Sequence, residues 1–380
     1  MKTIMGNYFN TVEEIFSQKK YPMSYLSDSF NDVESWQSAA RQKMRELLAY
    51  DPKETPLDPI VSDSYLKNGL IYEHLSYAQP YGPRTEGILM RPEGVKGKLP
   101  GILGLHDHGG FKYYGKEKIT DPKNLPNIMK SYQDMYYGGR AWAAELAKRG
   151  YVVFVPDLFL WGSRKMRIED VTEAYVKDAL DKPADTEGHI SAYNDFASKH
   201  EHDIAKTLIE AGTTWPGMML ADDMRALDFL LTQPQVDDKN IGCGGLSGGG
   251  LRTVFLSAMD ERVKCGVCAG FMSTSAEFAL YKVHNHTWMM YVPGLTNIMD
   301  FTDLYSLHGR KPAMVLFAED DDLYTKKGQA DADKRLREIY TKMGAPELYE
   351  GHFFPGSHRF DVDMQGIAFD FYDKWMKTLI

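Results

Sequence analysis

The chain contains 380 residues, of which 43% are hydrophobic and 26% are charged, and its formal net charge is -9 at pH 7. This composition favours a globular protein with a sizeable core, and the negative charge argues against nucleic acids and anionic membranes as partners. The three cysteines are too few for a disulfide framework, no apolar run is long enough to span a membrane, and residues 1–7 do not open a secretion signal, so a cytoplasmic location is expected.

Residues 1–65 are predicted to form a helical N-terminal extension. Its clearest helix begins near Asp32 and ends before Pro52, because apolar side chains recur between them at helical spacing. We expect this apolar stripe to pack in the core, and it consists of Trp36, Ala40, Met44, Leu47 and Leu48. Residues 66–380 contain no Gly/Ser-rich or Pro-rich linker, which favours one α/β domain. This domain carries three predicted insertions, at about 111–137, 165–217 and 272–311.

Four strands are predicted in the first part of this domain. Leu70–Leu75 and Thr85–Arg91 flank a Pro/Gly turn and are expected to pair antiparallel. Leu99–Leu105 and Tyr151–Pro156 are apolar runs connected through a predicted helix, Arg140–Arg149, which is typical of parallel strands. The pattern therefore predicts a mostly parallel sheet flanked by helices.

The insertion 111–137 is longer than most loops and is rich in tyrosine. It either forms one wall of a pocket or is purely structural. Tyr114 in this insertion, Trp161 after the fourth strand and Trp288 in insertion 272–311 are our candidates for substrate contacts. Aromatic rings at such positions either stack on a sugar or aryl ring or belong to the core, and both interpretations stay open.

The insertion 165–217 contains two helical stretches, Ile168–Leu180 and Ile190–Ala211. The second includes His200-Glu201-His202. We expect this triplet to lie on a solvated helix face and not to bind a metal, because no further ligand spacing supports a site.

Gly245-Leu246-Ser247-Gly248-Gly249 matches G-x-S-x-G between an apolar strand-like run and a helix. In this context the motif is typical of a nucleophile elbow, a tight turn that exposes the serine hydroxyl. Glycines two residues to either side leave space for the sharp turn. Ser247 is therefore the candidate nucleophile.

The predicted partners of Ser247 follow it in chain order. The apolar run Pro312–Phe317 predicts a buried strand, and of the four acids after Ala318 we choose Asp321 as the catalytic acid. Glu319 and Asp320 are expected to be solvated. His358 lies in a Gly-containing loop before the final helix, where it can act as the general base while Asp321 fixes its tautomer.

The turn His106–Gly110 predicts the remaining part of the site, an oxyanion hole. An H-x-x-G-G turn after a strand supplies a backbone N–H toward the nucleophile, here that of His108. The second donor is the N–H of Gly248. His106 and His108 could instead form a metal pair, but no complete ligand set accompanies them, so neither a metal nor a cofactor is expected.

These motifs resemble those of α/β-hydrolases of the group related to dienelactone hydrolase and acetyl xylan esterases. The resemblance extends over roughly residues 85–380 and rests on the turn His106–Gly110, the segments Ala221–Leu230 and Ile241–Gly250, and the regions of Asp321 and His358. It implies a serine hydrolase for small acyl esters, with acetylated sugars as the favoured substrates. Two departures are Asp107, where relatives usually carry glycine, and Thr325, where they often carry proline. Asp107 either repositions the turn or contacts the substrate.

Two other functions remain open from the sequence. A peptidase or amidase would use the same three residues, but it usually has a large recognition domain for which residues 1–65 are too few. A non-catalytic binding protein on this scaffold would normally lack part of the triad. The sequence leaves the natural substrate and the oligomeric state open.

Overall fold

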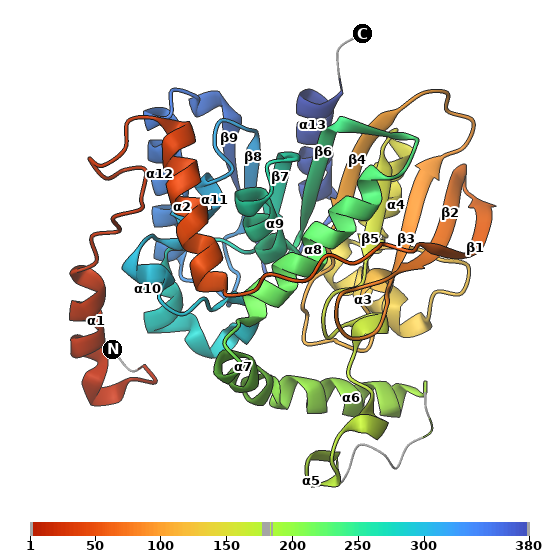
Figure 1. Ribbon diagram of the computed structural model, residues 1–380, viewed down its shortest axis with the longest axis horizontal. Coiled ribbons are helices and arrows are strands. Elements are labelled where there is room, and N and C mark those ends of the chain that lie inside the picture. The colour runs from red at the N-terminus through yellow and green to blue at the C-terminus, as the bar shows by residue number, and fades with distance from the viewer. Residues whose placement is uncertain (1–2, 177–182, 184, 378–380) are drawn as a thin grey trace.

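A computed structural model describes residues 3–176, 183 and 185–377, and within them the chain forms a nine-stranded sheet (Figure 1). The strands lie in the order β1-β2-β3-β5-β4-β6-β7-β8-β9. Their bounds are β1 (Ile60–Lys67), β2 (Leu70–Tyr77), β3 (Thr85–Pro92), β4 (Leu99–Gly104), β5 (Val152–Pro156), β6 (Val236–Leu246), β7 (Val263–Ala269), β8 (Ala313–Ala318) and β9 (Tyr349–Phe354).

The sheet is antiparallel at one end and parallel over the rest. Strands β1, β2, β3 and β5 pair antiparallel in turn, whereas β5, β4 and β6 to β9 pair parallel. Every residue of β5 and β8 is buried, as expected for parallel strands covered on both faces. The predicted mostly parallel sheet of the α/β-hydrolase type is therefore confirmed.

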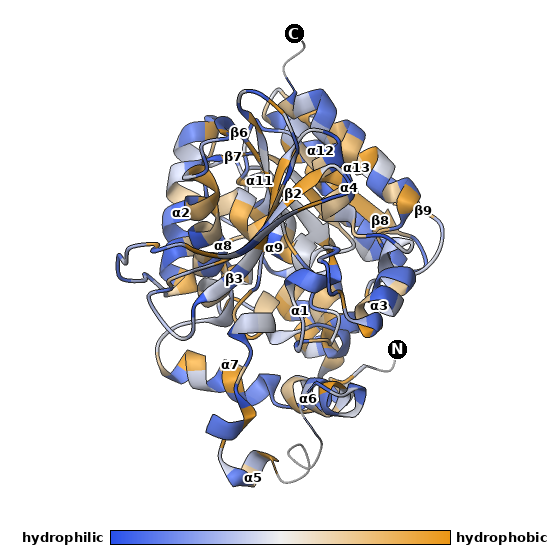
Figure 2. Ribbon diagram, turned by 90° about the vertical axis from the view of Figure 1, so that its right-hand side faces the viewer, coloured by the Kyte–Doolittle hydropathy of each residue, from blue (hydrophilic) through white to orange (hydrophobic). Residues whose placement is uncertain are grey.

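Helices cover both faces of the sheet (Figure 1). Those whose buried side chains share the first core cluster are α2 (Val33–Leu48), α8 (Trp215–Leu231), α9 (Gly248–Met259), α11 (Phe301–Ser306) and α12 (Lys326–Lys342). Those that share the second cluster are α3 (Asn127–Tyr137), α4 (Trp142–Lys148) and α13 (Val362–Met376). The remaining helices are α1 (Phe9–Ser17), α5 (Glu173–Val176), α6 (Glu187–Lys199), α7 (Glu201–Glu210) and α10 (Ser275–Glu277). Both ribbon views show α5, α6 and α7 at one end of the molecule, apart from the sheet (Figure 2).

The N-terminal segment contains the predicted helix and one strand that the sequence did not reveal. Helix α2 begins after Asp32, whose carboxylate accepts the N–H of Ser35 at 2.8 Å, and its predicted apolar stripe packs in the core. The prediction of helix up to residue 65 is wrong at its end, because β1 begins at Ile60. This edge strand is mostly exposed, so it lacks the apolar alternation of a half-buried strand. The division into 1–65 and 66–380 stays a prediction.

The insertion 165–217 differs from its predicted helices in detail. The stretch Ile190–Ala211 is two helices, α6 and α7, which meet at His200. The predicted stretch Ile168–Leu180 contains a short 3-10 helix, Ile168–Asp170, and α5, and its end lies outside the described residues. None of the helices described is both long and apolar enough to cross a bilayer.

Candidate active site

Ser247 occupies the sharp turn between β6 and α9. Its backbone has φ 54° and ψ -118°, a conformation that is strained for any residue with a side chain. The turn also packs tightly against β4, because a Cβ at Gly245 or Gly249 would lie 2.0 or 2.1 Å from the carbonyl oxygen of Leu105. The N–H of Ser247 donates to the carbonyl of Ala269 at 2.8 Å, which fixes the turn to β7. These are the features of a nucleophile elbow.

Asp321 and His358 form a close pair beyond the ends of β8 and β9. The Nδ1 of His358 lies 2.5 Å from one carboxylate oxygen of Asp321, and the other oxygen accepts the N–H of Leu323 at 2.9 Å. Asp321 is 4% exposed, whereas Glu319, Asp320 and Asp322 are exposed. An acceptor at Nδ1 favours the tautomer that carries its hydrogen there and leaves Nε2 as the base.

One cavity of about 640 Å³ brings Ser247, Asp321 and His358 together with both predicted oxyanion residues. A Cβ at Gly248 would lie 2.6 Å from the amide nitrogen of His108, so the two backbone donors lie close to one another. The first turn of α9 adds its positive dipole end at the same place. His358 in turn packs against Gly270, where a Cβ would approach its ring to 3.1 Å. Sequence reasoning did not identify Gly270.

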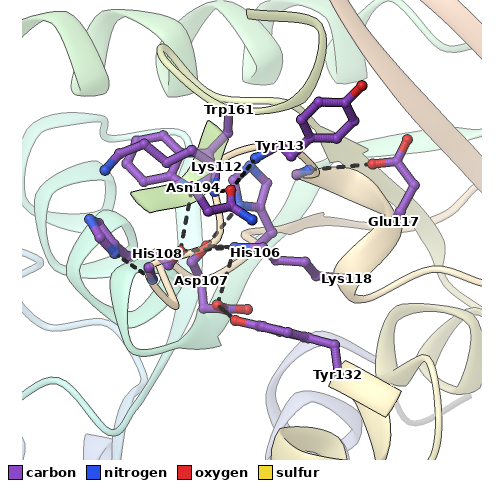
Figure 3. Close-up of polar contacts among 12 residues, drawn as sticks. His106, Asp107, His108, Lys112, Tyr113, Glu117, Lys118, Tyr132, Trp161 and Asn194 are labelled. Carbon is purple, nitrogen blue, oxygen red and sulfur yellow. Dashed lines mark hydrogen bonds and ion pairs between the residues drawn. The ribbon is translucent and has the colours of Figure 1, made fainter. Parts of the chain in front are cut away.

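The turn that carries His108 is fixed by buried charge (Figure 3). The carboxylate of Asp107 accepts the hydroxyls of Tyr132 and Tyr137, while the ammonium of Lys118 donates to the carbonyls of Asp107 at 2.8 Å and of His108 at 2.9 Å. Burial favours a neutral Asp107, but Lys118 and the two tyrosines outweigh it and lower the pKa of the carboxyl. Burial lowers the pKa of Lys118 to about 8, against the opposing effect of Asp107. Of the two roles left open for Asp107, these contacts favour holding the turn.

The two histidines of the turn are engaged in hydrogen bonds. His106 is buried, its Nδ1 lies 3.0 Å from the carbonyl oxygen of Asp107, and burial together with nearby Arg252 and Lys118 lowers its pKa well below the usual value. His108 accepts the N–H of Gly110 at Nδ1, 3.0 Å away, so that its hydrogen lies on Nε2. Across the ranges that the structure describes, no group of three or more His, Cys, Asp or Glu could hold a metal ion.

The three predicted substrate contacts lie in different places. Trp288 lines the cavity and is 38% exposed. Trp161 does not line it, because this ring is buried against the imidazole of His108 at 5.0 Å, and its Nε1 donates to the His108 carbonyl at 3.3 Å. Tyr114 lines a separate hollow beside Tyr65. The insertion 111–137 does contribute to the wall, but through Tyr132 and Tyr136. Trp161 and Tyr114 therefore lie outside the cavity that holds Ser247, and of the three candidates only Trp288 lines it.

Glu201 was predicted wrongly, since it is buried and lines the cavity. One of its oxygens lies 2.5 Å from Nε2 of His108 and also accepts the ammonium of Lys112. In the sequence, the helical spacing around His200 and His202 resembles a solvated face. The partners that bury Glu201 are not visible there, because His108 and Lys112 lie about 90 residues before it in the chain. No local signal could have identified this contact.

The model of the dienelactone hydrolase family matches residues 138–366, more than half of the chain. The chain belongs to the dienelactone hydrolase family. Membership of this family makes it an enzyme, a hydrolase of carboxylic esters, as expected from the resemblance.

Individual proteins resemble this chain at low sequence identity. The chain is 25% identical to YtaP of Bacillus subtilis (strain 168), which is named as a hydrolase, over 77% of this chain and 84% of that protein. A structure from Bacteroides fragilis NCTC 9343, named as an acetyl xylan esterase, has a TM-score of 0.70 at 16% identity and covers 93% of this chain and 83% of its own. A glucuronoyl esterase from Solibacter usitatus has a TM-score of 0.58 at 14% identity, over 91% of this chain and 94% of its own. The two structures share the fold with this chain.

Proposed function

We propose that this chain is a serine carboxylesterase in which Ser247 is the nucleophile, His358 the general base and Asp321 the acid that orients it. One observation carries the proposal. A serine in a strained elbow opens into the same cavity as a histidine whose Nδ1 is bonded to a buried carboxylate. This combination leaves Nε2 of the imidazole available to accept the serine proton.

The proposed reaction has two acyl-transfer steps. His358 accepts the hydroxyl proton of Ser247 as its oxygen attacks the ester carbonyl, and the N–H groups of His108 and Gly248 donate to the developing oxyanion. When the tetrahedral intermediate collapses, the bond to the alcohol breaks and the imidazolium protonates the leaving oxygen. Water then attacks the acyl-enzyme with His358 again as base, which releases the acid and restores Ser247.

The proposed substrates are small acyl esters, with acetylated carbohydrates favoured. The names of the similar structures support this class, since they include an acetyl xylan esterase and a glucuronoyl esterase. The cavity is consistent with it, because its lining includes both the exposed Trp288 and polar groups such as Asn285 and His202. A ring that offers one apolar face among hydrogen-bonding groups suits a sugar.

The test is a substrate panel measured on the wild type and on Ser247→Ala. We expect hydrolysis of p-nitrophenyl acetate and of an acetylated xyloside, with little turnover of aminoacyl-anilides. Ser247→Ala should reduce ester turnover by about 10⁴-fold or more and abolish labelling by a fluorophosphonate, with an unchanged fold by circular dichroism. Retained ester turnover in this variant would contradict the role of Ser247. Faster cleavage of anilides than of esters would instead indicate a peptidase, and an inactive, unlabelled wild type would indicate a binding protein.

A further inference from the structure

Glu201 connects three segments that are distant in the chain. It is the first residue of α7, and it is buried and lines the cavity. One oxygen accepts hydrogen bonds from His108 and Lys112, which follow β4. The other accepts the hydroxyl of Thr287 at 2.8 Å and the N–H of Trp288 at 3.4 Å. A single carboxylate is thus shared between the oxyanion turn and the insertion 272–311.

The contact with His108 has a defined direction. Because Nδ1 of this ring accepts the N–H of Gly110, Nε2 carries the hydrogen and donates it to Glu201. Burial lowers the pKa of His108 although Glu201 opposes this, so the ring is a neutral donor. The imidazole is held at both nitrogens, and its backbone carbonyl is held by Lys118 and Trp161.

The charge of Glu201 is balanced within the cluster. Burial opposes its ionisation, but His108 and Lys112 outweigh that cost and lower the pKa of the carboxyl far below its usual value. Lys112 is completely buried and lies 5.2 Å from the ring centre of Trp161. A buried ion pair with four donors to the carboxylate is satisfied, whereas removal of one partner would leave an unpaired buried charge.

A second contact shows that the insertion 165–217, which carries Glu201, also holds the chain beyond the turn. The side-chain oxygen of Asn194, on α6, accepts the backbone N–H groups of Lys112 at 2.8 Å and of Tyr113 at 2.9 Å (Figure 3). Helices α6 and α7 therefore fix the segment 108–113 from one side, and Lys118 fixes it from the other.

We propose that Glu201 is a positioning residue, which acts through the imidazole of His108 to keep the His108 N–H directed at the oxyanion. The proposal rests on the proposed function, in which that N–H is an oxyanion donor. Donors of this kind are effective only when they are oriented before the reaction, so a loosened turn should lower kcat while ground-state binding of a small ester changes little. Glu201 itself touches neither the nucleophile nor the base.

The principal variant is Glu201→Gln, which keeps the size of the side chain and removes its charge. With p-nitrophenyl acetate we expect kcat to fall by about 10- to 100-fold, less than for complete loss of an oxyanion donor, with KM within about twofold. Amide hydrogen exchange in the segment 106–110 should become faster. Glu210→Gln is the matched control, because it makes the same substitution at an exposed residue of α7 that does not line the cavity. It should keep the wild-type kcat, KM and exchange.

A second variant separates positioning from stability. Glu201→Leu with Lys112→Met removes both charges at similar volume, and such replacements are often neutral or stabilising. This double variant should regain thermal stability relative to Glu201→Gln and still have low kcat, because His108 has no acceptor.

The proposal is overturned if folded Glu201→Gln keeps kcat within twofold and exchange in 106–110 is unchanged, or if kcat recovers together with stability in the double variant. Failure of the proposed function has a different signature, namely ester turnover that survives Ser247→Ala. The exchange measurement reports on the turn in either case.

Discussion

Asp321 differs from its acidic neighbours in burial and in partners. Asp320 is exposed, pairs with Lys326 at 2.9 Å and accepts the N–H of Gly356 at 3.2 Å. It thus ties the loop of β8 to the loop that carries His358, whereas Asp321 contacts His358 itself. The two neighbouring carboxylates therefore have separable roles, Asp320 in loop structure and Asp321, under the proposed function, in the chemistry.

This separation predicts different kinetic effects of two adjacent substitutions. Asp321→Asn should lower kcat by about 10⁴-fold, because the amide no longer favours the tautomer with a free Nε2. Asp320→Asn should lower it by less than about tenfold, because only loop contacts weaken. Steady-state kinetics with p-nitrophenyl acetate measure both. A larger loss in Asp320→Asn would transfer the role of the acid to that residue.

The lowered pKa of Lys118 predicts how kcat changes on the alkaline side of its pH profile. As pH rises through about 8, Lys118 loses its proton and the positive charge beside the carbonyls of Asp107 and His108 disappears. We expect kcat to fall over this range. The folding stability should change in the opposite direction and rise with pH. Between about 8 and the ordinary value of 10.5 the unfolded chain binds the proton that the folded chain has lost, so this group adds stability as pH rises.

The measurement is kcat for ethyl acetate in a pH-stat from pH 6 to 10, with thermal melts at each pH to verify folding. Lys118→Met should have a lower kcat without this alkaline decrease. A wild-type profile that stays flat to pH 10 would contradict the prediction.

The residues that the sequence predicted and those that it missed differ in the range of their contacts. Ser247 and Gly248 belong to a local motif, and His358 and Asp321 follow in the chain order typical of the fold, so pattern and spacing sufficed to propose them. Glu201 contacts residues in other segments, and neither its helical context nor its composition indicated burial. Trp161 lies close to the site in the chain but packs beneath His108. Sequence position alone does not distinguish an aromatic residue that supports a site from one that faces the ligand.

At the scale of elements, the long parallel strands and their helices followed from apolar periodicity, whereas β1 did not. Helix α2 illustrates the favourable case. Trp36 is completely buried, lies 4.9 Å from the ring of Tyr25 and donates to the carbonyl of Met23 at 2.8 Å. Arg41 on the same helix binds the carbonyls of Ala258 and Leu307. Helix α2 therefore packs on the helices that cover the sheet.

This packing predicts a loss of stability without a loss of catalysis. Trp36→Ala should lower the free energy of unfolding by about 3–5 kcal/mol, through lost burial and the cavity that remains. No residue of α2 lines the cavity that holds Ser247, so kcat of the folded variant should be unchanged. Urea denaturation measures the first quantity. Lys43→Ala, at an exposed pair with Glu46, is the control and should change stability by less than about 0.5 kcal/mol. A Trp36→Ala variant as stable as the control would contradict a core role for α2.

At the scale of the whole molecule, the cavity is assembled from the ends of the strands and from all three insertions. Tyr132, Glu201 and Trp288 come from one insertion each and line the same space as Ser247. The strand ends supply the candidate chemical groups, and the insertions supply the wall and its supports. Fold-level patterns placed the first set and could not specify the second, since the insertions meet only in three dimensions.

The whole enzyme is expected to work without a metal. Exhaustive treatment with EDTA should leave ester hydrolysis unchanged, because the proposed mechanism uses only protein groups and His108 of the His106–Gly110 turn is hydrogen-bonded at both ring nitrogens. Activity is measured before and after chelation, and elemental analysis of the purified protein accompanies it. Activity that is lost on chelation and restored by zinc or manganese would refute this, and the turn would then be the first region to examine.

The shared carboxylate of Glu201 has a consequence for engineering this scaffold. A designer who exchanges the segment around Trp288 to admit a bulkier alcohol also replaces the donors to one oxygen of Glu201, and thereby disturbs the support of His108. A change made for substrate selectivity then also changes turnover. Grafts that move α7 and the segment 284–288 as one cassette, with Lys112 retained, should keep activity in more recipients than grafts of either piece alone.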